Sequence, residues 1–156
     1  MSKPRKPYRP KPVEMNPLIH FFGGLKRVDS EHLTELNVKN SKAMVSICGG
    51  TGTRADWDIL VGMQNMALVL AEIHFDMQYH EMLIAGRDAL HAVGIRWLEH
   101  KKFIFKGDEL QSLNNSIEVH EAQLNALRVI DVERAYAEVQ RRIKFHINTK
   151  KVMEMN

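Results

Sequence analysis

Cysteine and long apolar runs are almost missing from the chain. Cys48 is the single cysteine among 156 residues, so no intramolecular disulfide can form. The longest apolar run covers residues 66–71 and ends at Glu72, far below the ~20 residues that a membrane-spanning helix needs. The N-terminus is basic but lacks the apolar stretch of a signal peptide. We therefore expect a cytoplasmic protein of one domain with no membrane contact.

Proline is absent after Pro17, because all five prolines lie in the first 17 residues. Proline fixes φ and removes a backbone donor, so this segment cannot be a helix or a central strand. We predict an extended, polyproline-II-like arm over residues 1–17. No proline interrupts the rest, and we expect a helical domain over residues 18–147 and a short basic tail over 148–156.

Apolar spacing predicts an all-α bundle of four or five helices. A first helix starts near Ser30 and reaches residues 44–48, which fit a helix end or a short strand equally well. Thr53 and Asp56 form a capping-box pattern, and the helix that follows is apolar nearly all round, which predicts a central position. A third helix covers residues 82–101.

Small residues and breaks shape the second half of the predicted bundle. Gly86 and Gly94 in the third helix would let another helix approach closely. A fourth helix starts at Gly107 and breaks at residues 114–116. The last helix covers residues 117–147, with a slip in its apolar stripe between positions 127 and 132. Residues 44–48 and 103–105 leave room for one short two-stranded ribbon.

The glycine-rich segment 49–53 is a candidate phosphate loop, since backbone N–H groups before a helix favour anions. It resembles the GGTGT core of the tubulin-type nucleotide loop. Arg54 stands where that family normally has a further glycine, and no Walker lysine follows. We interpret the segment as a connector between helices and predict no cofactor.

Candidate metal-binding and catalytic residues are few. Glu72, Asp76 and His80 are spaced to share one helix face, and carboxylates with an imidazole can bind a divalent metal. The Glu-x-x-His pattern of di-iron bundles is missing, so we favour a solvated face and predict no metal. Cys48 follows an apolar stretch and is interpreted as a small core residue. His120 lies on an apolar stripe and is interpreted as a core or interface residue. We therefore expect no enzymatic activity.

Two basic segments are the remaining functional signal. The first twelve residues carry five cations and no acid, and a second basic run closes the chain. Cations on an extended arm can neutralise successive phosphates, and an interleaved tyrosine can stack on a base. The predicted binding residues are Lys3, Arg5, Lys6, Tyr8, Arg9 and Lys11 in the arm, and Arg141, Arg142 and Lys144 near the C-terminus. The partner is a nucleic acid or an acidic protein surface, a solubilising tail is the simpler alternative, and a homo-oligomer is left open.

Three segments together resemble a known group of proteins. They are residues 6–13, residues 56–60 leading to 65–71, and residues 107–110. Their order is similar to that in small uncharacterised accessory proteins encoded by phages and plasmids of proteobacteria. The resemblance implies a bacterial cytoplasm and a mobile element, and it brings no assigned activity or catalytic residues. The expected function is a non-enzymatic binding protein whose arm contacts nucleic-acid phosphates in a regulatory or packaging role. The alternative is a phage or plasmid inhibitor of a host protein, such as an anti-defence or host-takeover factor.

Overall fold

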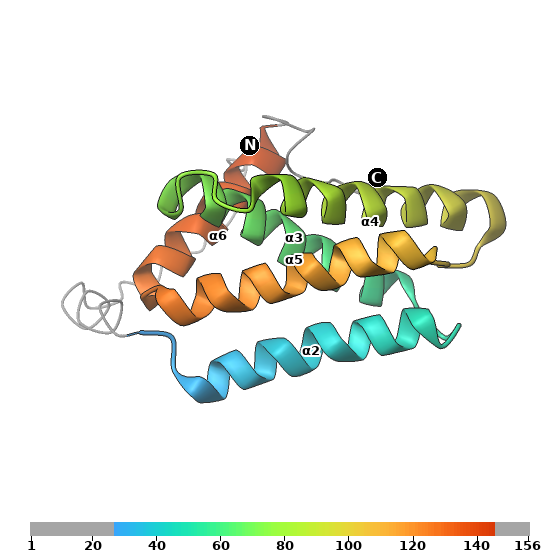
Figure 1. The fold of residues 1–156 in the computed structure, drawn as a ribbon, viewed down its shortest axis with the longest axis horizontal. Helices are drawn as coiled ribbons and strands as arrows, with labels where there is room; N and C mark the ends of the chain where they lie inside the picture. Colours follow the sequence, from blue (N-terminus) through green and yellow to red (C-terminus); the bar gives the residue numbers. More distant parts are fainter. Residues whose placement is uncertain (1–26, 146–156) are drawn as a thin grey trace, which may run out of the picture.

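The computed structural model describes residues 27–145 and shows five helices in this range. They are α2 (Ser30–Cys48), α3 (Arg54–His74), α4 (His80–His100), α5 (Gly107–Ala126) and α6 (Val129–Lys144). Helices α2 to α5 run alternately in opposite directions, and α6 crosses one end of this bundle (Figure 1). No strand occurs between residues 27 and 145, which confirms the all-α fold and excludes a ribbon there. The predicted arm (1–17) and tail (148–156) lie outside the described residues.

Helix α3 forms the centre of the bundle, as its sequence predicts. The Thr53 hydroxyl accepts a hydrogen bond from the Asp56 amide at 3.3 Å, and the Asp56 carboxylate accepts one from the Thr53 amide at 2.8 Å. This capping box satisfies two backbone donors that a helix start leaves unpaired. Helices α2, α4, α5 and α6 all pack against α3. Leu60, Leu68 and Leu70 are fully enclosed as a result.

Helix α2 continues unbroken to Cys48, so the strand considered for residues 44–48 does not form. Met44 and Ile47 are buried in a cluster with residues of α3, and this packing favours the helix over an isolated strand. The chain turns at Gly50, where φ is +80° and a glycine avoids strain. Cys48 is exposed, which contradicts its assignment to the core. It lies one residue past Ile47, about 100° further round the helix.

The glycines of α4 lie where neighbouring helices come closest. A Cβ atom on Gly86 would lie 2.8 Å from the Cβ of Ser116 on α5, and one on Gly94 would lie 2.9 Å from the ring of Trp57 on α3. Both contacts confirm that these positions allow close approach. Residues 103–105 form a connection and no strand. Phe103 is buried there, and its ring stacks 5.5 Å from that of Trp97.

The boundary between the last two helices differs from the prediction. Helix α5 passes through residues 114–116 without a break, because Ser116 is fully buried against α4 and its hydroxyl donates to the Met82 carbonyl at 3.2 Å. The single helix predicted over residues 117–147 is also wrong. Helix α5 ends at Ala126 and α6 begins at Val129. The slip in the apolar stripe therefore marks the end of one helix and the start of another.

Candidate functional site

Helix α6 has one buried face and one cationic face. Ala135 and Val139 pack into a cluster with α3 and α5 residues. The opposite side exposes Arg134, Arg141 and Lys144. A helix with this pattern holds its place through its apolar stripe and leaves its charges to solvent. Two of the C-terminal residues predicted to bind a partner, Arg141 and Lys144, are thus accessible.

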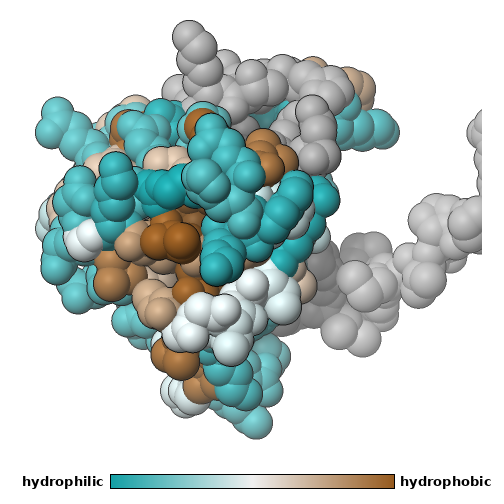
Figure 2. Space-filling view, turned by 90° about the vertical axis from the view of Figure 1, so that its right-hand side faces the viewer, coloured by the Kyte–Doolittle hydropathy of each residue, from teal (hydrophilic) through white to brown (hydrophobic). Residues whose placement is uncertain are grey.

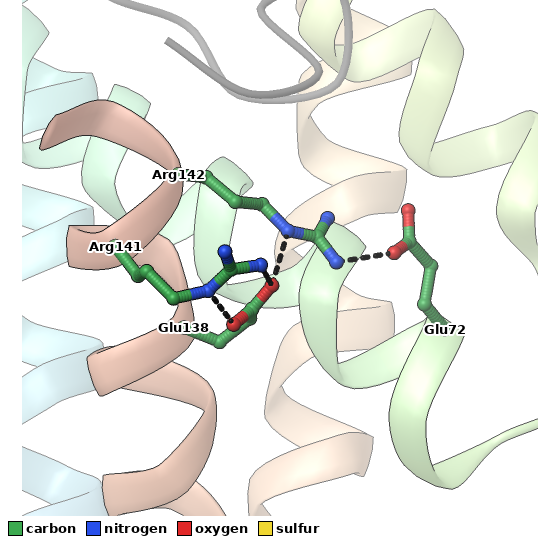
Figure 3. A network of polar contacts seen from close by, with 4 residues as sticks. All are labelled: Glu72, Glu138, Arg141 and Arg142. Carbon is green, nitrogen blue, oxygen red and sulfur yellow. Dashed lines mark hydrogen bonds and ion pairs between the residues drawn. The ribbon is translucent and has the colours of Figure 1, made fainter. Parts of the chain in front are cut away.

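Arg142 lies in a different environment from its neighbours. Its side chain is buried, with only 9% of the residue exposed. Its guanidinium donates to the Glu72 carboxylate at 2.9 Å and to the Glu138 carboxylate at 2.8 Å (Figure 3). The Glu72 contact joins α6 to the C-terminal turn of α3. Arg142 therefore holds the bundle together, and its charge is compensated inside the protein.

Glu138 links the buried arginine to an exposed one. Arg141 donates to the two Glu138 oxygens at 2.8 and 2.9 Å, in the bidentate geometry that arginine favours with carboxylates (Figure 3). Hydrogen bonds from Arg141 and then Arg142 lower the pKa of Glu138 to about 2. Glu138 is therefore ionised at neutral pH. It neutralises part of the charge of Arg141, while Arg134 and Lys144 form no ion pair with another described residue.

An isolated backbone bridge places the first described residue beside the start of α6. Arg27 pairs antiparallel with Arg128, which directly precedes α6. Both side chains are exposed, and the Arg128 guanidinium contacts the Asp131 carboxylate at 2.9 Å. The chain thus enters the domain beside the start of α6, at one end of the bundle (Figure 1).

Two aromatic side chains of α6 and its C-cap are exposed. Tyr136 is 58% exposed and Phe145 is 59% exposed. The Lys144 ammonium lies 5.3 Å from the centre of the Phe145 ring. We call these exposed residues of the bridge and of α6 with its C-cap the α6 basic edge: Arg27, Arg128, Arg134, Arg141, Lys144 and Phe145. Sequence reasoning missed four of them, Arg27, Arg128, Arg134 and Phe145, although the cations of the last helix are visible in the sequence.

The predicted arm residues Lys3, Arg5, Lys6, Tyr8, Arg9 and Lys11 lie outside the described residues. The charge balance nevertheless sets them apart from the domain. Residues 27–145 contain 14 Lys and Arg against 17 Asp and Glu, a net charge of −3, whereas the whole chain is +3. The excess positive charge therefore belongs to the two terminal segments.

The stripe of Glu72, Asp76 and His80 does not form one helix face. Helix α3 ends at His74, and Asp76 adopts a positive φ of 45° in the turn that follows. Glu72 faces Arg142 instead. Between residues 27 and 145, no group of three or more His, Cys, Asp or Glu side chains is arranged to hold a metal ion.

The two remaining candidates are His120 and the glycine-rich segment, and the contacts of both are structural. His120 is buried, as predicted, with its Nδ1 atom 3.3 Å from the Gln123 amide oxygen. Burial lowers the pKa of His120 to about 4, so the ring is neutral at neutral pH. In the glycine segment, the Thr51 amide donates to the Ser46 carbonyl at 2.9 Å and closes the end of α2. This geometry is that of a connector between α2 and α3.

Comparison with known proteins finds no matching family model, no matching curated protein and no matching solved structure. Among the described residues, no helix combines the length and apolarity needed to cross a membrane.

Proposed function

We propose that this protein is a non-enzymatic nucleic-acid-binding protein. Its N-terminal arm and the α6 basic edge would contact phosphates together, in a regulatory or packaging role. The observation that carries the proposal is the bridge between Arg27 and Arg128, which places the first described residue at the start of a helix with exposed cations. Binding at several phosphates releases counterions and provides affinity without base recognition.

The exposed aromatic ring of the edge supports the same proposal. Phe145 is exposed, and the Lys144 ammonium lies 5.3 Å from its ring centre. Exposed aromatic rings next to positive charge can stack on unpaired bases. The acidic domain behind the edge would repel nucleic acid and keep contact limited to this side. Arg142 has no part in the proposed interface, because two carboxylates already compensate its charge.

The proposal is tested by fluorescence anisotropy with a labelled 20-base-pair duplex at several salt concentrations. Five arm cations contact up to about five phosphates, so deleting residues 1–12 should reduce the slope of log affinity against log salt by up to about 4.5. The double variant Arg134→Gln with Lys144→Gln should reduce it by up to about 1.8, at about 0.9 per contact. Tyr8→Ala should weaken binding at an unchanged slope if Tyr8 stacks on a base.

A matched control uses two exposed cations away from this edge, Lys42 on α2 and Arg54 at the start of α3. The double variant Lys42→Gln with Arg54→Gln loses the same charge and should bind like the wild type. Equal losses in the control and the α6 variant would show that only net charge matters and would contradict the assignment of the edge. No binding at low salt would refute the nucleic-acid proposal itself.

Docking on a host protein is the second candidate function, and exposed apolar surface favours it. At the end of the bundle opposite α6, apolar atoms gather in a hollow bordered by polar ones (Figure 2). Leu98 lies in the last turn of α4 and Ile104 in the connection to α5, and both are more than half exposed. Capture of one bacterial protein from a nuclease-treated lysate, lost in the variant Ile104→Glu, would support inhibition of a host protein over nucleic-acid binding.

A further inference from the structure

Helix α6 turns a mixed polar face away from the bundle. Among the helices it packs chiefly against α3, and it crosses one end of the bundle (Figure 1). On the side opposite the buried Ala135 and Val139, exposed residues recur at intervals of three and four. They are Glu133, Ala137, Gln140, Arg141 and Lys144. This face therefore presents a carboxylate, a methyl group, an amide and two cations side by side.

The dimensions of α6 suit the major groove of duplex DNA. A helix with its side chains is about 10–12 Å wide, and the major groove is about 12 Å wide. Ala137 lies at the centre of the exposed face and carries no long side chain, so the backbone of α6 can come close to the base edges. The major groove of duplex RNA is deep and too narrow for side chains to read. The shape of this face therefore favours DNA over RNA.

Arg141 has two parallel donors left over after its contact with Glu138. Its Nε and Nη2 atoms donate to the two Glu138 oxygens at 2.8 and 2.9 Å. Its Nη1 atom points away from Glu138 (Figure 3), and no described residue accepts a hydrogen bond from it. Because a guanidinium has five N–H groups, the edge formed by Nη1 and Nη2 keeps one donor on each nitrogen. Such a pair of donors matches the O6 and N7 acceptors that guanine presents in the major groove.

Glu138 is a positioning residue in this arrangement. Its carboxylate is itself fixed, because it also accepts a hydrogen bond at 2.8 Å from the buried Arg142. The side chain of Arg141 is 50% exposed, so its remaining donors are accessible to a partner. A side chain that is already held in place loses less conformational entropy on binding. The contact with Glu138 therefore prepares Arg141 to bind without occupying the donors that binding needs.

We propose that α6 enters the major groove of duplex DNA and that Arg141 reads a guanine there. The Gln140 amide, on the same face, is suited to pair with an adenine beside it. Arg134 and Lys144 lie near the two ends of the helix and contact phosphates, which set its register. This inference rests on the proposed nucleic-acid binding and adds a sequence preference, which phosphate contacts alone do not provide.

Selection from a random duplex DNA library by nuclease-treated full-length protein tests the sequence preference. We expect a short motif that contains guanine, bound at least about tenfold more tightly than a shuffled duplex of the same composition. Arg141→Lys keeps the charge but loses the paired donors, so it should lower this ratio about fivefold or more, the discrimination of one bidentate contact. Arg54→Lys, at an exposed arginine where α3 starts, is the matched control and should leave the ratio unchanged. Circular dichroism should be unchanged in both variants, because both side chains reach solvent.

Replacing the selected guanine by 7-deazaguanine tests the groove directly, because it removes N7 and leaves base pairing intact. The wild type should bind this duplex about fivefold or more weakly. Arg141→Lys should lose little further affinity, since its contact with N7 is already missing. An RNA duplex of the selected sequence should be bound no better than a shuffled RNA duplex.

The outcomes separate this inference from the proposed function. Salt-dependent binding that enriches no sequence would overturn the role of α6 in the major groove and leave the proposed function standing. The role of Arg141 would be overturned by a selected motif that Arg141→Lys still discriminates like the wild type. It would also be overturned by a selected guanine that tolerates 7-deazaguanine. No binding to any duplex at low salt would refute the proposed function, and this inference with it.

Discussion

Gly86 gives the sharpest test of how α4 and α5 pack. In the interior of a helix, replacing glycine by alanine normally stabilises by about 1 kcal/mol, because alanine loses less conformational freedom on folding. At Gly86 the added Cβ would overlap with the Ser116 hydroxyl oxygen. It would also lie 2.8 Å from the Ser116 Cβ and 2.9 Å from the Gln64 amide oxygen. The two effects have opposite signs, so the sign of the measured change decides which one dominates.

The steric effect should dominate at Gly86. Rotating the Ser116 hydroxyl away breaks its hydrogen bond to the Met82 carbonyl, at a cost of about 1 kcal/mol. The Cβ–Cβ contact remains and forces the helices apart, which costs about 1–3 kcal/mol in a packed core. After the gain in helix propensity, we expect Gly86→Ala to destabilise by about 2 kcal/mol. The melting temperature should then fall by roughly 5–10 °C for a domain of this size.

Gly62 on α3 is the matched control, because it is also in a helix interior but has no atom within 4 Å of an added Cβ. Gly62→Ala should stabilise by about 0.5–1 kcal/mol in urea unfolding. Adding Ser116→Gly to Gly86→Ala should recover part of the loss, which a double-mutant cycle measures. If Gly86→Ala stabilises as Gly62→Ala does, the close packing of α4 on α5 is wrong.

Two further predictions concern buried charge. The pKa of His120 is lowered from its usual 6.5 to about 4 by burial. As the pH falls, the unfolded chain binds a proton at His120 before the folded chain does. The free energy of unfolding should therefore fall by roughly 3 kcal/mol between pH 6.5 and pH 4. Urea unfolding of His120→Gln should show a smaller dependence of this free energy on pH, and an unchanged dependence would refute the burial argument. Glu72→Gln leaves the buried Arg142 with one charged partner and should cost about 2 kcal/mol, since breaking a buried pair leaves charge uncompensated. Glu81→Gln, an exposed control on α4, should cost less than about 0.5 kcal/mol.

Local signals explain which parts of the fold can be predicted from sequence. The start of α3 depends on Thr53 and Asp56, three residues apart, and the structure places the helix start there. The end of α2 also depends on a local residue, because the chain turns at Gly50, which adopts a positive φ. Prediction failed at residues 114–116, where polar residues typical of a cap lie within a continuous helix. The reason is distant in sequence, because Ser116 fits against Gly86, 30 residues earlier.

The candidate site was predictable only in part, for the same reason. The cations of the last helix are visible in sequence, but the contact of Arg142 with Glu72 spans 70 positions. The bridge of Arg27 with Arg128 spans 101 positions. Neither has a local pattern. The apparent stripe of Glu72, Asp76 and His80 failed because a positive φ at Asp76 ends the helical spacing on which it relied.

Arg142 and Lys144 show why residue type alone could not assign function along α6. The two cations are two residues apart, and two residues correspond to about 200° around a helix. Arg142 points towards α3 and is compensated by Glu72 and Glu138, whereas Lys144 points to solvent beside Phe145. A cation that faces the core must find carboxylates or destabilise the fold, so its presence is explained by stability. A cation that faces solvent makes no such demand on the fold, so replacing Lys144 should change stability little.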